Sequence, residues 1–226
     1  MADIKLKLKD GTIVPGATTV AGLLDKSFLV KWANNLGLQG IEYQKYVDES
    51  ARKGKLIHTI LESHNAKHPV DLSEYTEDEI NYLALVFRQH YLKWEQQHIL
   101  EPIFCEYSLV SEKYKFGGII DMYCKLDGLY TVVDYKTSSS ISREHILQVS
   151  SYVELLKENN YPVDQLLILN VKKTMNDDLE VKYVSLEEAS SYWEIFKHLL
   201  SIYWLKREMK WNDKKKKEEK KDGEQV

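Results

Sequence analysis

The sequence predicts an α/β protein in which a central, mostly mixed β-sheet is flanked by helices and preceded by an N-terminal helical region. Helical periodicity dominates the first part of the chain, and strand patterns begin near Leu100. The second part then has the order strand, strand, strand, helix, strand, which is typical of helices packed against a sheet. The dipeptide Asp127-Gly128 indicates a tight turn between two antiparallel strands.

The N-terminal region is expected to contain a short hairpin and two helices. Residues 1–14 show a weak alternation of apolar and polar side chains around a turn, which indicates the hairpin. Thr18 or Thr19 is a candidate N-cap for a first helix that continues through Trp32. A second helix is expected at about 43–65, after two glycines that would end the first.

Three further helices are expected along the chain. The third begins near Thr76, because Glu79 three residues later completes a capping box, and its apolar residues recur at helical spacing up to Trp94. Residues 144–159 and residues 187 to about 211 also show helical patterns. Five apolar or alternating runs predict strands, at residues 103–110, 116–126, 129–136, 165–171 and 179–184.

These elements divide the chain of 226 residues into three parts. Residues 1–49 form an N-terminal hairpin and helical extension, and residues 50–211 form the main domain. Residues 212–226 are lysine-rich and have no apolar anchors, so we expect a disordered charged tail.

Composition excludes several classes of protein. The net charge of −4 does not indicate nucleic-acid binding by the molecule as a whole, although a local basic groove is compatible with it. Cys105 and Cys124 are too few for a disulfide framework, a structural zinc site or an iron–sulfur cluster. The sequence has no apolar run that could span a bilayer and no secretory signal at its start, so we expect a cytoplasmic protein.

The residues that carry chemistry lie on the two strands that Asp127-Gly128 joins. Side chains alternate along a strand, so Asp134 and Lys136 point to the same face. Asp121, on the preceding strand, should lie across from residues 134–136 within a register step. One face of this ribbon would therefore hold two carboxylates and a lysine.

Such a group favours a divalent cation. Two neighbouring carboxylates repel each other, and Mg²⁺ prefers oxygen ligands, with the backbone carbonyl of Tyr135 as a further candidate. The cation would lower the pKa of a water and stabilise charge on an attacked phosphate. Lys136 could orient or deprotonate that water and neutralise the developing charge. The alternative is a surface ion pair between Asp134 and Lys136, which is common for Asp-x-Lys in a strand.

Further residues extend this pattern into a resemblance. Gly54 is followed by His58 on the second predicted helix, and Gln148 and Tyr152 lie four apart on the helix after the site strands. Together with Asp121 and Asp134-Tyr135-Lys136, these residues resemble the core of PD-(D/E)XK nucleases, specifically the RecB-like branch. The resemblance covers about residues 50–172, and the N-terminal part also resembles phage-encoded exonucleases.

The resemblance implies a fold and a role for each matching residue. The fold is a restriction-endonuclease-like core. Lys136 would be the catalytic lysine, and Gln148 and Tyr152 would line the site, contact DNA or support Lys136. Metal ligands would be His58, Asp121, Asp134 and the Tyr135 carbonyl, and two accessory acidic positions would be Glu62 and Glu106. Alternatives remain, since His58 could be an ordinary helix histidine, Gln148 and Tyr152 could serve helix packing, and Glu62 could be solvated.

The implied function is hydrolysis of DNA phosphodiester bonds with Mg²⁺, for which Mn²⁺ would substitute, by an exonuclease of phage recombination or DNA processing. A phage-encoded enzyme would act in the bacterial cytoplasm, with a recombinase or a single-strand-binding protein as candidate partners. Two alternatives stay open: a structure- or site-specific endonuclease of the same fold, and a DNA-binding module that does not cut.

Overall fold

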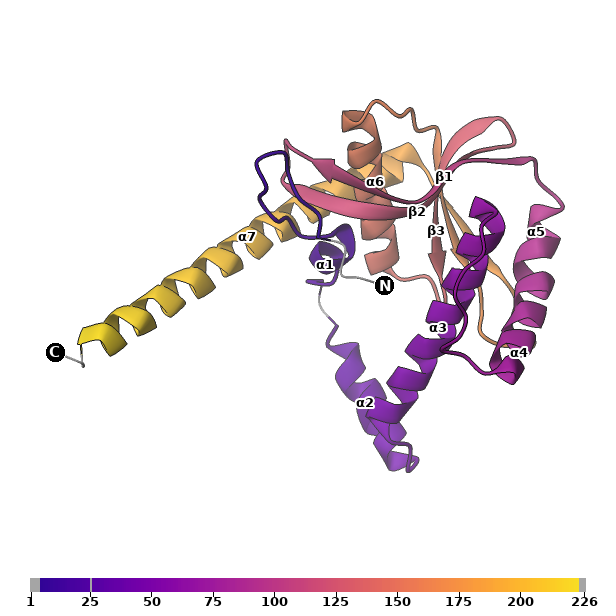
Figure 1. Cartoon of the computed structure of the whole chain (residues 1–226), viewed down its shortest axis with the longest axis horizontal. Helices are drawn as coiled ribbons and strands as arrows, with labels where there is room; N and C mark the ends of the chain where they lie inside the picture. The colour runs from indigo at the N-terminus through magenta and orange to yellow at the C-terminus, as the bar shows by residue number, and fades with distance from the viewer. Residues whose placement is uncertain (1–4, 25, 224–226) are drawn as a thin grey trace.

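The computed structural model describes residues 5–24 and 26–223 of the chain (Figure 1). The expected hairpin at residues 1–14 lies partly outside this range. In its described part, Lys7 and Ile13 form an antiparallel bridge, and the Leu8 N–H donates to the Thr12 carbonyl across the turn. Gly11 in this turn has φ +85°, a conformation that glycine adopts without a steric penalty.

A five-stranded mixed sheet forms the centre of the molecule, and this confirms the predicted fold class. The strands follow one another in the sheet in chain order, and only β3 and β4 are parallel to each other. The parallel pair requires a crossover, which helix α6 (Arg143–Glu158) provides. The bounds of the strands are β1 Leu100–Ser111, β2 Phe116–Leu126, β3 Leu129–Lys136, β4 Gln165–Asn170 and β5 Glu180–Val184.

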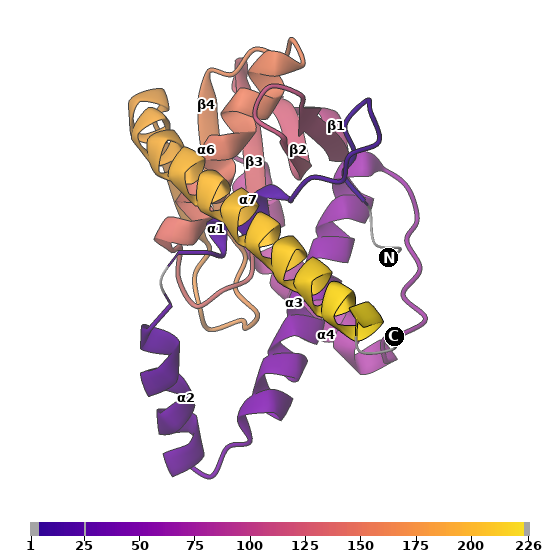
Figure 2. The ribbon, with the colours of Figure 1, turned by 90° about the vertical axis from the view of Figure 1, so that its left-hand side faces the viewer.

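Helices cover both faces of this sheet (Figures 1 and 2). Neighbouring residues of β3 belong to different cores: Val132 packs with helices α1, α6 and α7, and Val133 packs with α3 and α4. Both valines have no exposed surface. A central strand that is buried on both faces is expected to be almost continuously apolar, so a charged residue on it must have a partner or a function.

The first predicted helix is in fact two helices. Helix α1 (Ala17–Ala21) is capped by Gly16 rather than by a threonine, and α2 (Phe28–Leu38) follows separately. Gly22 ends α1, and a Cβ at this glycine would lie only 3.1 Å from the Thr18 carbonyl oxygen. The expectation of one continuous helix was therefore wrong, because α1 is buried against the sheet and α6 while α2 leads away from them (Figure 1).

The next helices agree with the sequence more closely. Helix α3 (Tyr43–Ala66) ends one residue after the predicted bound, and α4 (Glu77–Phe87) begins with the predicted capping box. Beyond Phe87 the helix widens into a π-helical segment, η1 (Arg88–Leu92), and continues as α5 (Lys93–Glu95). The sequence pattern did not reveal this wider turn.

The π-helical segment holds the loop that follows β4. The Gln89 side chain donates to the Met175 carbonyl at 2.9 Å, and His90 Nε2 lies 2.9 Å from the Thr174 carbonyl oxygen. Because an inserted residue rotates side chains on a helix, Gln89 and His90 can both face this loop. The loop is thereby fixed beside the carboxyl end of β4.

The last helix, α7 (Leu186–Gly223), continues well beyond Trp211. The expectation of disorder from residue 212 is therefore corrected for residues 212–223. The sequence of this segment is rich in lysine and glutamate, which are strong helix formers. The end of α7 projects away from the sheet (Figure 1). No helix in the described part of the chain is long and apolar enough to cross a membrane.

Candidate active site

The carboxyl end of β3 carries an ion pair inside the protein. Asp134 has no exposed surface, and its Oδ2 lies 2.5 Å from Nζ of Lys136, whose side chain is 16% exposed. The two residues share a face of the strand, as alternation predicts. The pair is thus not the exposed surface ion pair of the alternative interpretation, because a buried carboxylate on a central strand is costly unless it is paired or used.

Asp121 reaches the same place from β2. The pairing of Met122 with Val133 puts Asp121 next to the end of the β2–β3 ladder, beside Asp134. Oδ2 of Asp121 accepts a hydrogen bond of 2.7 Å from the backbone N–H of Tyr135. Burial raises the pKa of Asp121, and Lys136 and the hydrogen bond from Tyr135 partly oppose this rise. The structure therefore brings Asp121, Asp134 and Lys136 together.

Electrostatics at this site keep the lysine charged. Burial raises the pKa of Asp134 to about 6. The charge of Lys136 opposes this rise, and the charge of Asp121 adds to it. Burial lowers the pKa of Lys136, but Asp134 and Asp121 together outweigh it, so the net direction is upward. Lys136 is therefore an ammonium group at neutral pH. It is suited to neutralising negative charge, and it is not a proton acceptor in this state.

Helix α6 supports Asp134 from one side. Nε2 of Gln148 donates to Oδ1 of Asp134 at 3.1 Å and to the Tyr152 hydroxyl at 2.7 Å. Gln148 therefore contacts the aspartate rather than Lys136. Tyr152 is only 1% exposed, which places it beneath the site as a supporting residue and not on a surface that DNA could touch.

Two glycines allow this close packing. A Cβ at Gly118 on β2 would lie 2.7 Å from Cε1 of Tyr152, and a Cβ at Gly54 on α3 would lie 2.6 Å from Oγ1 of Thr137. Both distances are shorter than a Cβ normally tolerates. Gly118 thus lets α6 approach the sheet, and Gly54 lets α3 approach the segment that follows Lys136.

His58 lies on α3, one turn after Gly54. Burial is the main cause that lowers its pKa to about 4; Lys136 lowers it further, and Asp134 opposes both. The imidazole is therefore neutral at physiological pH, which is the form that binds metal ions. In the described residues no hydrogen bond or ion pair joins His58 to either aspartate. Its ring meets that of Tyr135 edge-on, with a centroid distance of 6.5 Å.

The accessory acidic residues approach from α3 and β1. Burial raises the pKa of Glu106 to about 8, and the neighbouring carboxylates of Asp121, Glu62 and Asp134 raise it in the same direction. Glu106 has φ +48°, a left-handed conformation that is strained for this residue type and that is often found at functional sites. Oε1 of Glu62 also lies 3.8 Å from Nε2 of His68, so this carboxylate has a second neighbour outside the acidic cluster.

His145 was not among the residues that the sequence pointed to. It belongs to the first turn of α6, where its Nδ1 lies 3.1 Å from the backbone N of Ser142. Burial and then Lys136 lower its pKa to about 4. The sequence signal was the Ser142-x-x-His145 spacing at a helix start, which resembles a capping box with histidine in place of glutamate.

Comparison with known proteins identifies the family. The model of the PD-(D/E)XK nuclease superfamily matches residues 31–212. The chain belongs to this superfamily. No curated protein is a significant match to the sequence.

Solved structures of two other proteins have a distant similarity to this chain. One is a candidate exonuclease from Eubacterium rectale, with 10% identity and a TM-score of 0.48 over 65% of this chain and 64% of that one. The chain thus spans less than two thirds of that protein. Another is an alkaline exonuclease from Laribacter hongkongensis, with 13% identity and a TM-score of 0.35 over 86% of this chain and 92% of that one.

PD-(D/E)XK nucleases typically use a divalent metal ion, and the residues at the end of β3 fit one. Among the described residues, no three histidine, cysteine or acidic side chains converge closely enough to form a complete site alone. Mg²⁺ does not need such a set, because it retains waters and binds through one or two carboxylates and substrate oxygens. Oδ2 of Asp134 is buried and lies 2.5 Å from Nζ of Lys136, and Oδ1 accepts the hydrogen bond from Gln148, so a cation bound here would share these oxygens with the two donors.

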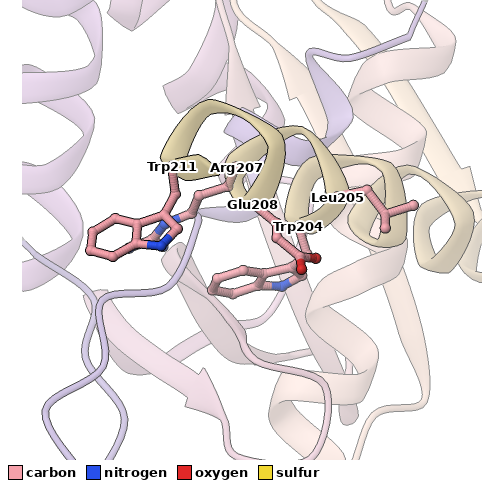
Figure 3. Close-up of a pocket in the computed structure, with 5 residues that line it drawn as sticks. All are labelled: Trp204, Leu205, Arg207, Glu208 and Trp211. Carbon is pink, nitrogen blue, oxygen red and sulfur yellow. The ribbon is translucent and has the colours of Figure 1, made fainter. Parts of the chain in front are cut away.

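The apolar hollow on α7 is a separate feature of this protein (Figure 3). Its lining residues all belong to α7, and Figure 3 shows the indoles of Trp204 and Trp211 extending from that helix. Arg207 lies over the Trp204 ring, 5.1 Å from its centroid. No residue of the carboxylate cluster contributes to this hollow, so it is not the site of the chemistry.

The clustered carboxylates predict a pH-dependent stability without metal. The folded-state pKa of Glu106 (about 8) exceeds its ordinary 4.5, so the folded protein binds more protons between these values and loses stability as the pH rises. Glu106→Gln should therefore stabilise the protein at about pH 9, by roughly 1–2 kcal/mol once partial exposure is allowed for, and by much less at about pH 5. Thermal unfolding in the presence of a chelator, at both pH values, measures this change in stability.

Glu101→Gln is the matched control, because Glu101 is an exposed carboxylate on the same strand. This variant should leave the melting temperature nearly unchanged at both pH values. An equal stabilisation by both variants at high pH would show that Glu106 carries no special repulsion.

Proposed function

We propose that this protein is a Mg²⁺-dependent deoxyribonuclease that hydrolyses phosphodiester bonds and acts as an exonuclease. The observation that carries the proposal is the meeting of Asp121, Asp134 and Lys136 at one end of the central strands, with Lys136 Nζ at 2.5 Å from a fully buried aspartate. Membership in the PD-(D/E)XK nuclease superfamily supports the same chemistry.

Each residue has a definable part in this proposal. Asp121, Asp134, His58 and the Tyr135 carbonyl would hold the cation, with Glu106 as a further acidic neighbour. The cation, when bound, supplies an activated water and Lewis-acid stabilisation of the phosphate. Because two aspartates maintain its charge, Lys136 would bind the attacked phosphate and offset the negative charge that develops on it.

The supporting residues act by fixing Asp134. Gln148 donates to one of its oxygens and leaves the other facing Lys136. Tyr152, packed against Gly118, in turn holds Gln148. A carboxylate that is positioned before the substrate arrives does not have to reorganise during the reaction, and this lowers the barrier.

The resemblance of the motifs to the RecB-like branch and to phage-encoded enzymes favours an exonuclease of phage DNA recombination or processing, which would work beside a recombinase or a single-strand-binding protein. A site- or structure-specific endonuclease would use the same carboxylates and lysine. The two activities differ in whether they require a DNA end.

Digestion of one plasmid in two forms tests the proposal. With Mg²⁺, linear plasmid should be degraded progressively, and covalently closed plasmid should survive. Ca²⁺ in place of Mg²⁺ should permit DNA binding without cutting, because Ca²⁺ tolerates looser coordination. Cutting of the closed form into discrete products would favour the endonuclease. Binding of DNA without any Mg²⁺- or Mn²⁺-dependent cutting would identify a module that does not hydrolyse DNA.

A further inference from the structure

A second basic site lies beside Lys136, on the loop that follows β4. Because β3 and β4 are parallel, their carboxyl ends meet at one edge of the sheet, where Lys136 pairs with Asn170. The backbone N–H of Val171 donates to the Lys136 carbonyl at 2.7 Å, so the loop leaves the sheet at the proposed active centre. Lys173 is the third residue after Asn170 on this loop.

The Lys173 side chain lies against α3. Its ammonium group donates a hydrogen bond of 2.6 Å to Oγ of Ser50. A Cβ at Gly54 would lie 3.7 Å from Cε of Lys173 and 2.6 Å from Oγ1 of Thr137, the residue after Lys136. The absence of a side chain at Gly54 therefore makes room for Lys173 and Thr137 to approach the same point on α3.

The charge at this point has no counterion among the described residues. Burial, together with the positive charge of Lys53 on α3, lowers the pKa of Lys173, and no carboxylate opposes this effect. In the described part of the chain, neither Lys53 nor Lys173 forms an ion pair. The neighbouring lysines differ, since Lys55 lies 2.5 Å from a Glu74 oxygen and Lys172 lies 3.0 Å from a Glu180 oxygen.

We propose that Lys53 and Lys173 form a subsite for a backbone phosphate of the nucleic-acid substrate, next to the phosphate that is cleaved. The inference rests on the proposed nuclease function. Two ammonium groups that repel each other, one of them half-buried, gain most from a shared anion. The hydroxyls of Ser50 and Thr137 add hydrogen-bond donors, which phosphate oxygens accept well. The subsite would anchor the strand without reading its sequence.

Salt-dependent DNA binding tests the subsite. The full-length protein is titrated with a fluorescein-labelled duplex oligonucleotide in Ca²⁺ buffer at several salt concentrations, and anisotropy gives the affinity. Lys173→Met should weaken binding about tenfold and reduce the slope of log affinity against log salt by about 0.9, the value for one phosphate contact. Lys53→Met should change the slope in the same direction. Lys55→Met, which removes a charge that Glu74 already balances, is the matched control.

Two further variants separate binding from folding. Ser50→Ala removes the hydrogen bond but keeps both charges, so the salt slope should not change. Lys173→Arg should retain most of the wild-type slope. If Lys173→Met binds with the wild-type affinity and slope, the subsite is refuted while the nuclease proposal stands. If the wild-type protein binds no DNA in Ca²⁺, both proposals fail together.

Discussion

Asp134→Asn is expected to lower Mg²⁺-dependent DNA cleavage by about a thousandfold, the upper range for loss of one preorganised electrostatic group. Asparagine has nearly the same shape, and its oxygen can still accept the hydrogen bond from Gln148. It has no negative charge, so it neither attracts a cation strongly nor maintains the charge of Lys136. Initial rates on linear DNA, measured beside thermal unfolding, give the result.

Asp164→Asn provides a control on the opposite end of the same strand pair. Asp164 also accepts a hydrogen bond from a β3 backbone N–H, that of Tyr130, at 2.8 Å, but it is exposed and distant in sequence from the site residues. The Asp164→Asn variant should cleave DNA at close to the wild-type rate. A folded Asp134→Asn protein with wild-type activity would remove this aspartate from the proposed centre.

Lys136→Met should also lose cleavage, by about a hundredfold to a thousandfold, because the positive charge that offsets phosphate charge is gone. Its second effect is on Asp134. In the wild-type protein, the charge of Lys136 limits the pKa of the Asp134 carboxyl to about 6. In the variant, the loss of this charge should raise that pKa further above its ordinary value of 3.8. A carboxyl with a raised folded-state pKa favours folding less as the pH increases, since the folded state then binds the extra proton.

The metal-free Lys136→Met protein should therefore be less stable, relative to wild type, at about pH 8 than at about pH 5. Thermal unfolding at both values measures the difference, and single-turnover cleavage measures the chemistry. The double variant Asp134→Asn, Lys136→Met should lose this pH dependence, because no ionisable group is left in the pair. A pH-independent deficit in the single variant would mean that the ion pair does not control the charge of Asp134.

The arrangement of Asp121, Asp134 and Lys136 could be predicted because it depends on residues that are close together in the sequence. Asp134 and Lys136 share a face by simple alternation, and the turn at Asp127-Gly128 fixes which residues of the preceding strand lie opposite them. The bounds of β2 and β3 agree with the prediction for the same reason. The parallel direction of the β3–β4 pairing, which was not predicted, is compatible with the helix between the two strands.

Other features depend on packing that no short segment encodes. The break after Ala21 follows from the burial of α1 against the sheet and α6. The left-handed backbone of Glu106 is a conformation that sequence patterns do not reveal in a residue other than glycine. The contact of Gln148 with Asp134, rather than with Lys136, depends on how closely α6 approaches at Gly118. The proximity of Lys173 to Lys53 joins segments that are far apart in the chain.

The hydrogen bond from the Tyr135 N–H to Asp121 makes the spacing of the two aspartates a property of the main chain. The Asp121 carboxylate is hydrogen-bonded to the backbone of β3, the strand that carries Asp134. Rotation of the Asp121 side chain away from Asp134 would break this hydrogen bond, which opposes separation of the two carboxylates while the sheet is intact. Heat inactivation of the proposed DNA cleavage should accordingly coincide with cooperative melting of the whole sheet rather than precede it.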